Sequence, residues 1–101
     1  ADPAKFRLAT FLIRTGKIAE AKTLLETVNR EAPERTPAWV LRAEVALADK
    51  EYDEANRLVE RALGQAPGDF DARALQAQIR LAQNKPGEAV ALLERLAEAF
   101  P

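Results

Sequence analysis

Apolar residues in the middle of the chain recur at the spacing of an α-helix. Over residues 52–63, one face carries apolar side chains and the other carries charged ones, which predicts a helix with one face in water. The apolar stripe consists of Tyr52, Ala55, Leu58, Val59, Ala62 and Leu63. The segment before it, residues 38–48, is apolar almost all the way round. Because such a helix must be sandwiched between neighbours, we expect two layers of helices.

This two-helix pattern recurs along the whole chain every 34 residues, the distance from Pro33 to Pro67 and from Pro67 to Pro101. Three sets of positions keep one residue type at that spacing: Pro33, Pro67 and Pro101; Ala9, Ala43 and Ala77; and Ala21, Ala55 and Ala89. Such a period predicts stacked helix-turn-helix units, each of which buries the next. We therefore expect an all-α fold, an α-solenoid of three repeats over approximately 2–35, 36–69 and 70–101, in a single domain over residues 1–101.

Local signals mark the helix ends within each unit. Side chains that can cap a first helix stand at Asp2, Thr36 and Asp69. Breaks near residues 15–17, 49–51 and 84–86 separate the two helices, and the repeated Pro ends the second one. The repeated alanines are the short side chains that closely crossing helices require. Acidic residues that suit the helix dipole begin the second helices, at Glu20, Glu54 and Glu88.

The middle unit resembles the tetratricopeptide repeat. It has that family's Trp and small residue in the first helix, as Trp39 and Ala43, and its Tyr and late Ala in the second, as Tyr52 and Ala62. The resemblance covers the whole chain, with departures at Lys5, Arg42, Arg73 and Gln76. The composition, rich in Ala, Leu and Arg, is similar to that of bacterial repeat arrays in envelope assembly and exopolysaccharide export machinery.

Composition narrows the possible chemistry. The chain has no Cys, His, Met or Ser, which excludes disulfides, Cys or His zinc sites and nucleophilic triads built on these residues. Catalysis would have to use carboxylates such as Glu44 and Asp71, which we expect at exposed helical positions without an apolar pocket to raise their pKa values. We therefore expect no enzyme, no catalytic residue, no metal and no cofactor. We expect Trp39, at the start of a sandwiched helix, to anchor the core rather than stack on a ligand.

The charge balance points to a protein or peptide partner. With 15 basic and 16 acidic residues, the net charge of −1 gives no reason to bind nucleic acid. No apolar run approaches the roughly 18 residues that direct membrane insertion requires. The absence of Cys is compatible with both periplasm and cytoplasm, so the compartment stays open.

The resemblance implies a concave surface lined by the first helices, where a partner segment would bind. The residues expected to form this groove are Phe6, Thr10, Ile13, Arg14, Val40, Glu44, Leu47, Gln78 and Leu81, flanked by Pro37, Ala48, Asp71, Ala74 and Ala82. Its apolar character suits an apolar peptide or an amphipathic helix. The alternative is an architectural spacer in a longer array, with the groove filled by its own parent chain.

A well-known ligand class of the family does not fit this groove. The positions that would clamp the acidic tails of heat-shock chaperones hold no basic residue here; they are Phe6, Thr10, Leu41, Asp71 and Leu75. An Asp would repel a terminal carboxylate, so we do not expect that ligand.

The two ends of the array form a second candidate surface. Leu93, Leu96, Ala97 and Phe100 continue the stripe that faces a following unit, and Phe11 stands where a first helix faces a preceding one. Open repeat ends expose apolar surface. We therefore expect a chain cut from a longer array, with self-association through Phe11, Leu93, Leu96 and Phe100.

Overall fold

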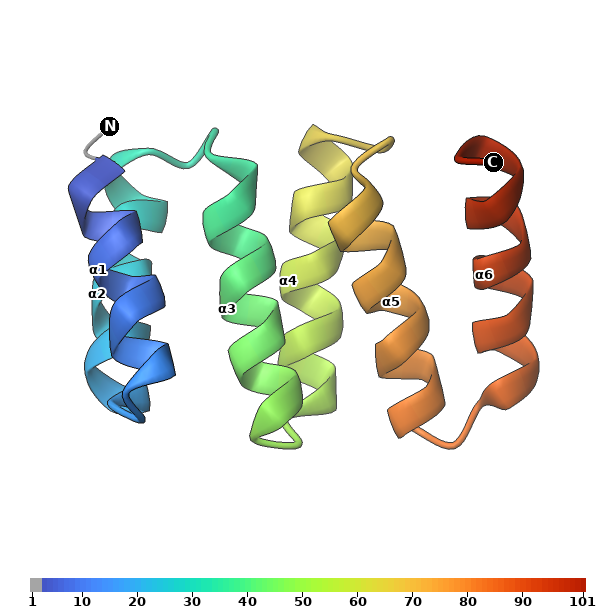
Figure 1. The fold of residues 1–101 in the computed structure, drawn as a ribbon, viewed down its shortest axis with the longest axis horizontal. Helices are drawn as coiled ribbons and strands as arrows, with labels where there is room; N and C mark the ends of the chain where they lie inside the picture. Colours follow the sequence, from blue (N-terminus) through green and yellow to red (C-terminus); the bar gives the residue numbers. More distant parts are fainter. Residues whose placement is uncertain (1–2) are drawn as a thin grey trace.

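The computed structural model describes residues 3–101 and confirms the all-α solenoid (Figure 1). Within this range the chain forms six helices: α1 (Pro3–Arg14), α2 (Ile18–Glu31), α3 (Thr36–Ala48), α4 (Tyr52–Gln65), α5 (Phe70–Ala82) and α6 (Pro86–Ala99). They pair as three helix hairpins, α1 with α2, α3 with α4 and α5 with α6. The hairpins follow one another in chain order.

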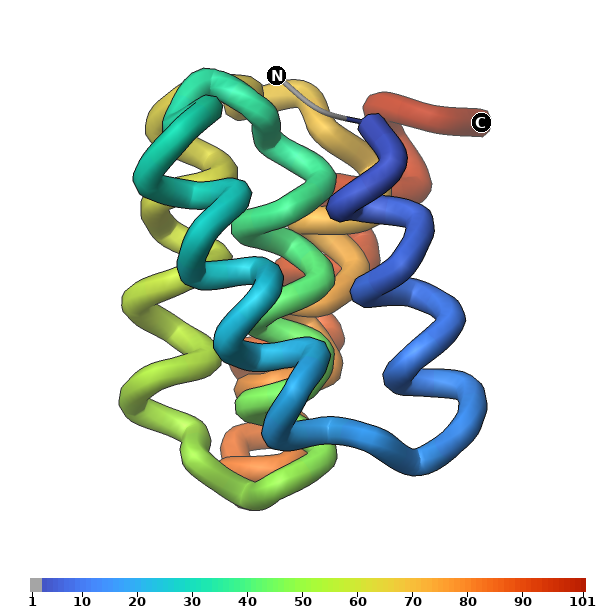
Figure 2. Tube along the Cα trace, turned by 90° about the vertical axis from the view of Figure 1, so that its left-hand side faces the viewer, coloured from blue at the N-terminus to red at the C-terminus, as the bar shows by residue number. Residues whose placement is uncertain are grey.

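The hairpins stack along the longest axis of the molecule, whose extents are 36 × 24 × 21 Å. Figure 2 shows α2 and α4 on one side of α1 and α3, so the first and second helices of the first two hairpins form two layers. Helix α3 contacts α2, α4 and α5, which explains why its sequence is apolar nearly all round. Helix α4 instead keeps a charged outer face, with Asp53, Glu60 and Arg61 exposed.

Small residues lie where the two helices of each hairpin cross. The predicted pairs are all buried: Ala9 with Ala21, Ala43 with Ala55, and Ala77 with Ala89. The larger core cluster joins α3, α4 and α5 and includes Leu58, Val59 and Ile79. A smaller cluster under α1 and α2 is built around Leu25 and Val28.

Helix ends follow the predictions in part. The Asp69 carboxylate accepts the backbone N–H of Ala72 at 2.9 Å and caps α5. The prediction for Thr36 is wrong, because α3 begins at that residue and its hydroxyl lies past the cap position, donating to Gln65 Oε1 at 3.1 Å. Asp2 lies outside the described residues. The second helices end just before Pro33, Pro67 and Pro101, as expected.

The breaks between paired helices use positive φ angles. Gly16 has φ 83° and Asn84 has φ 63°, and both residue types tolerate this conformation. Lys50 occupies the equivalent turn with φ 61°, although its side chain disfavours the left-handed region. The middle turn is therefore strained relative to the other two.

Polar side chains form hydrogen bonds and an ion pair between neighbouring hairpins. Arg42 Nη1 of α3 donates to Asn29 Oδ1 of α2 at 2.9 Å, and Arg80 of α5 donates to Asn56 of α4. Lys22 reaches from α2 to Asp49 at 2.6 Å, and this bond is the main cause that raises the pKa of Lys22. Arg42, a departure from the family pattern, thus has a structural role at a junction.

Candidate functional site

The face formed by α1, α3 and α5 has two hollows near the junction of the first two hairpins. The first, which we call the carboxylate hollow, measures about 200 Å³ and receives side chains from α1, α3 and the start of α5. Its lining consists of Phe6, Pro37, Val40, Leu41, Glu44, Asp69 and Asp71. The hollow therefore combines an apolar floor with three acidic residues.

The second hollow, which we call the isoleucine hollow, measures about 120 Å³. It is lined by Ile13, Ile18, Leu41, Glu44, Val45, Ala48 and Asp49. Leu41 and Glu44 belong to both hollows, so the two lie next to each other along α3. Both hollows combine apolar side chains with carboxylates.

The structure brings part of the predicted groove together. Phe6, Ile13, Val40 and Glu44 line one or both hollows, as do the flanking residues Pro37, Ala48 and Asp71. Thr10, Arg14, Leu47, Gln78 and Leu81 line neither, and nor do Ala74 and Ala82.

The residues outside the hollows differ in their surroundings. The Thr10 hydroxyl donates to the carbonyl of Phe6 within α1, at 3.1 Å. Leu47 packs against the core of α3, α4 and α5, whereas Leu81 is 62% exposed. The predicted groove residues therefore do not share one environment.

Leu41 is the central groove residue that sequence reasoning missed. It lies on α3 between the two hollows and also packs against the core cluster under α1 and α2. The sequence did mark its position, but only as a place where the family would hold a charged clamp. An apolar residue at that position supplies floor area instead of charge.

The environment of Glu44 differs from the expectation. Glu44 is an exposed residue, yet partial burial of its carboxyl between the two hollows raises its pKa, and the negative charge of Asp71 raises it further. The prediction that no apolar pocket would raise a pKa here is therefore wrong. Two acidic side chains from different helices share this region, which favours a cation between them.

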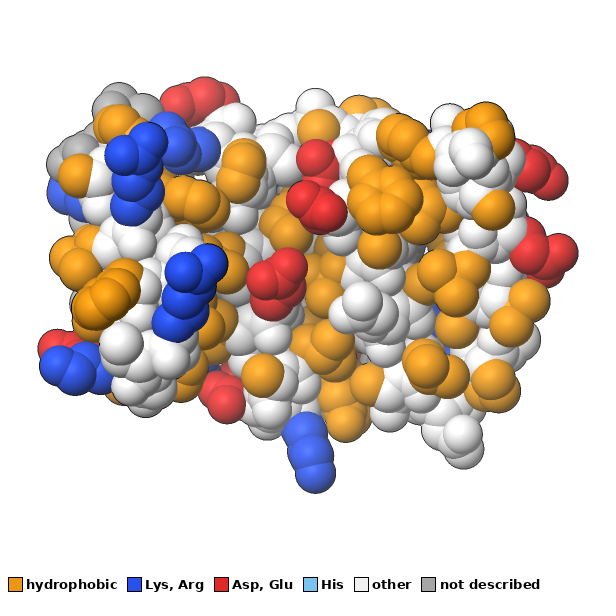
Figure 3. Space-filling model, viewed as in Figure 1, with side chains coloured by type: hydrophobic (Ala, Val, Ile, Leu, Met, Phe, Trp, Pro, Cys, Tyr) orange, Lys and Arg blue, Asp and Glu red, His pale blue; other side chains and the backbone are white. Residues whose placement is uncertain are grey.

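Charge is unevenly distributed over the same face. Figure 3 shows acidic side chains near the middle of the face, basic ones toward α1, and apolar patches between and beyond them. The Arg35 guanidinium lies over the ring of Phe6, which lines the carboxylate hollow, 5.5 Å from the ring centre. A bound segment would therefore meet a basic edge and an acidic centre.

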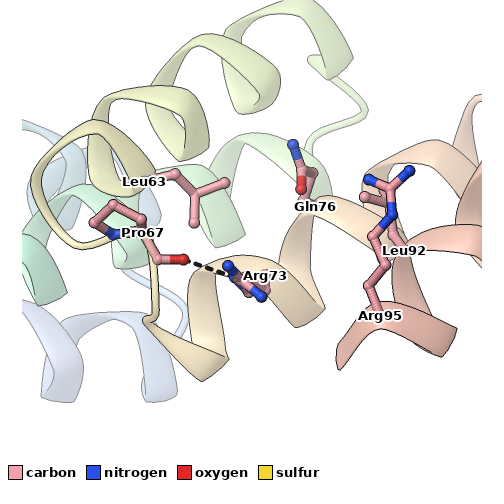
Figure 4. Close-up of a pocket in the computed structure, with 6 residues that line it drawn as sticks. All are labelled: Leu63, Pro67, Arg73, Gln76, Leu92 and Arg95. Atoms are coloured by element: carbon pink, nitrogen blue, oxygen red, sulfur yellow. Dashed lines mark hydrogen bonds between the residues drawn. The ribbon is translucent and has the colours of Figure 1, made fainter. Parts of the chain in front are cut away.

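A third hollow lies between α4, α5 and α6 and measures about 210 Å³ (Figure 4). It is lined by Leu63, Pro67, Arg73, Gln76, Leu92 and Arg95. Arg73 Nε donates to the Pro67 carbonyl at 2.6 Å. Trp39, at the same position of the preceding unit, makes the equivalent bond to the Pro33 carbonyl at 2.8 Å. The hollow therefore lies where the middle unit has an aromatic ring.

Trp39 anchors the core, as predicted. It is half-buried and packs against the core cluster of α3, α4 and α5. The Arg61 guanidinium lies over its ring, 4.7 Å from the centre, so the exposed side of the indole is covered from within the chain.

The predicted end residues are placed differently from one another. Phe11 is 61% exposed and Leu93 is 48% exposed, whereas Leu96 is 6% exposed and the prediction that it faces outward is wrong. Leu96 repeats the positions of Val28 and Ala62, which are also buried, and it is buried although no hairpin of the described chain follows it.

Phe100 has a partner within the chain. Its ring lies edge-on against Phe70, with centroids 5.2 Å apart, and Phe100 is still 47% exposed. Two exposed residues were missed, Leu8 and Val90, which lie one helical turn from Phe11 and Leu93. The same periodicity that predicted Phe11 and Leu93 could have found them.

Two absences in the described part of the chain bear on function. Among residues 3–101, no three or more acidic side chains are arranged so that they could hold a metal ion. No helix in the same range is both long and apolar enough to cross a membrane.

Sequence profiles and solved structures of other proteins match this chain. Two sequence profiles, both described as tetratricopeptide repeat, match residues 6–70 and 46–101. The globular C-terminal domain of P. aeruginosa LpoP is similar in structure, with 24% identity, a TM-score of 0.85, and coverage of 93% of this chain and 92% of that one. MamA AMB-1 is also similar, with 19% identity, a TM-score of 0.83, and coverage of 94% and 56% respectively. At these identities the likeness shows the fold alone, and no curated protein matches the sequence.

Proposed function

Because the chain belongs to the tetratricopeptide repeat family, whose domains generally mediate protein–protein interaction, we propose that it is a noncatalytic scaffold that binds a partner segment on the face of α1, α3 and α5. The observation that carries this proposal is the pair of adjoining hollows that share Leu41 and Glu44. Two neighbouring hollows on one helix match successive side chains of a bound segment. The proposed surface extends past them to the exposed Leu81 on α5.

The chemistry of the hollows specifies the segment further. Phe6, Val40 and Leu41 favour apolar side chains, whereas Glu44 and Asp71 favour a positive charge beside them. A bound Lys or Arg would relieve the repulsion between the two carboxylates and lower the pKa of Glu44. We therefore propose an amphipathic segment in which a basic residue lies next to apolar ones.

This proposal is tested with two synthetic helical peptides. The first carries Leu at positions i, i+3, i+4 and i+7 with flanking Lys residues, and the second has Glu in place of each Lys. Titration into ¹⁵N-labelled protein should shift the amide signals of Phe6, Leu41 and Glu44 with the Lys peptide. The Glu peptide should bind at least about tenfold more weakly, because it meets like charge.

A charge reversal provides the matched comparison. Glu44→Lys should shift the preference toward the Glu peptide, whereas Glu60→Lys, on the exposed face of α4, should leave it unchanged. Equal effects of the two variants would show that net charge alone sets the preference. That result, or shifts confined to α2, α4 and α6, would refute binding in these hollows.

The alternative function is an architectural spacer within a longer repeat array. The exposed apolar residues at both ends of the solenoid, Leu8 and Phe11 at one and Val90 and Leu93 at the other, favour it. A setting in bacterial envelope assembly or export is proposed on the similarity of composition. A spacer would bind neither peptide, so the titration separates the two functions.

A further inference from the structure

The solenoid has two exposed apolar ends, and we propose that they bind each other, so that a second copy of the chain stacks head to tail on the first. The leading end consists of Leu8, Phe11 and Leu12 on α1, and the trailing end of Val90, Leu93 and Ala97 on α6. Each copy would then continue the solenoid of its neighbour. This contact is separate from the face of α1, α3 and α5 proposed to bind a segment.

The junctions inside the chain show what covers such positions. Phe11 repeats at Val45 and Ile79, which are buried in units that have a preceding hairpin. Leu93 repeats at Leu25 and Val59, which are buried in units that have a following hairpin. Phe11 and Leu93 themselves are 61% and 48% exposed, because the described chain offers no such hairpin to them. A copy stacked in the same geometry would supply both.

The first internal junction predicts which end residues would meet. There, Asn29 of α2 accepts a hydrogen bond from Arg42 of α3. The equivalent position on the last unit is Ala97, and the equivalent of Arg42 on the first unit is Leu8. A polar pair inside the chain is thus replaced by an apolar pair between the ends.

The second internal junction gives the same result at different positions. Asn56 of α4 accepts a hydrogen bond from Arg80 of α5. The equivalent of Asn56 on the last unit is Val90, and the equivalent of Arg80 on the first unit is Leu12. At both positions the Arg is replaced by Leu on the leading end, and the Asn is replaced by Ala or Val on the trailing end. The two ends are therefore both apolar at the positions that would meet, which makes them complementary. Either end would leave a polar group without its partner if it met an internal junction surface.

The proposed contact joins two different surfaces, so it is heterologous and each copy keeps one free end. Association should therefore grow with concentration instead of stopping at a dimer. Sedimentation velocity over a dilution series of about a hundredfold measures this directly on the unmodified chain. The weight-average sedimentation coefficient should rise steadily with concentration, and a constant monomer value would overturn the proposal.

Two blocking variants test the polarity of the contact. Phe11→Asp blocks the leading end and Leu93→Asp blocks the trailing end, and each should weaken self-association at least about tenfold. In a mixture of the two variants, the trailing end of one binds the leading end of the other. The resulting dimer should grow no further, because both of its outer ends carry the blocking substitutions. Dimers of either variant alone would indicate like-to-like pairing and overturn the head-to-tail arrangement.

Folding and register need their own controls. Both substituted positions are exposed, so circular dichroism should stay helical. Gly64→Asp, at an exposed position of the middle hairpin with open space around it, should associate like the wild type. Leu8→Arg and Ala97→Asn should each weaken association, and the double variant should regain it by rebuilding the internal pair between copies. A double variant as weak as the singles would overturn this register.

Discussion

Replacing Arg73 with Trp should stabilise the protein by filling the hollow between α4, α5 and α6. That hollow measures about 210 Å³, and the equivalent space in the middle unit holds the Trp39 ring. The indole N–H can also take over the bond that Arg73 now donates to the Pro67 carbonyl. The substitution therefore adds apolar volume without leaving that carbonyl unpaired.

The size of the effect follows from the area that a Trp would bury. An aromatic side chain buries about 150–250 Å², and about half of that at this open site gives roughly 2–3 kcal/mol at about 25 cal/mol per Å². Ordering the new side chain and displacing Arg95 oppose this gain by about 1–2 kcal/mol. We expect Arg73→Trp to raise the free energy of unfolding by about 1 kcal/mol and the Tm by several degrees.

Thermal and urea unfolding followed by circular dichroism measure this change, at a protein concentration low enough to avoid association. Trp39→Arg is the reverse substitution and should cost about 2–4 kcal/mol, because it empties a filled site. Arg57→Trp, at an exposed position on α4, controls for a Trp that fills no hollow. If the free energy of unfolding of Arg73→Trp were no higher than that of Arg57→Trp, the reasoning would be refuted.

Three further predictions follow from the packing, the turns and the groove. Ala55→Leu should cost about 1–3 kcal/mol in urea unfolding, because the crossing with the facing helix has no room for it. Lys50→Gly should gain about 0.5–1 kcal/mol by relieving the positive φ, whereas Lys50→Ala keeps the strain and should stay near the wild type in the same assay. Glu44→Gln should be more stable than the wild type near neutral pH, and the difference should shrink as pH falls, because the raised pKa makes the ionised form unfavourable in the folded state. Thermal unfolding at several pH values checks this; a difference independent of pH contradicts it.

The fold was predictable because its determinants are local and repeated. The alanines at the crossings, the Pro after each second helix and the apolar stripe of α4 are all visible at fixed spacings, and a constant period along the chain leaves few other arrangements. The end residues Phe11 and Leu93 were predictable for the same reason. Leu96 was not, since its helical stripe has an inward and an outward side that spacing alone does not separate.

The groove was less predictable because it depends on how three helices from different units lie together. Nothing local to α3 indicates that Leu41 separates two hollows, or that Asp71 of α5 comes close enough to Glu44 to affect its pKa. Tertiary geometry decides these features. The left-handed turn at Lys50 differs, because its own residue type argues against that conformation while Gly16 and Asn84 hold the equivalent positions of the other units.

Trp39 combines two roles, filling space and donating a hydrogen bond, and Arg73 at the equivalent position keeps only the second of them. Trp39 both fills space under Arg61 and donates a hydrogen bond to the Pro33 carbonyl. Arg73 keeps the bond to Pro67 but leaves the hollow open. The side chain at this position thus donates to a loop carbonyl in both units, and Gln65 also donates to the Pro33 carbonyl. The ring adds packing energy on top of that bond, and for this reason a Trp at position 73 is expected to add stability without changing the fold.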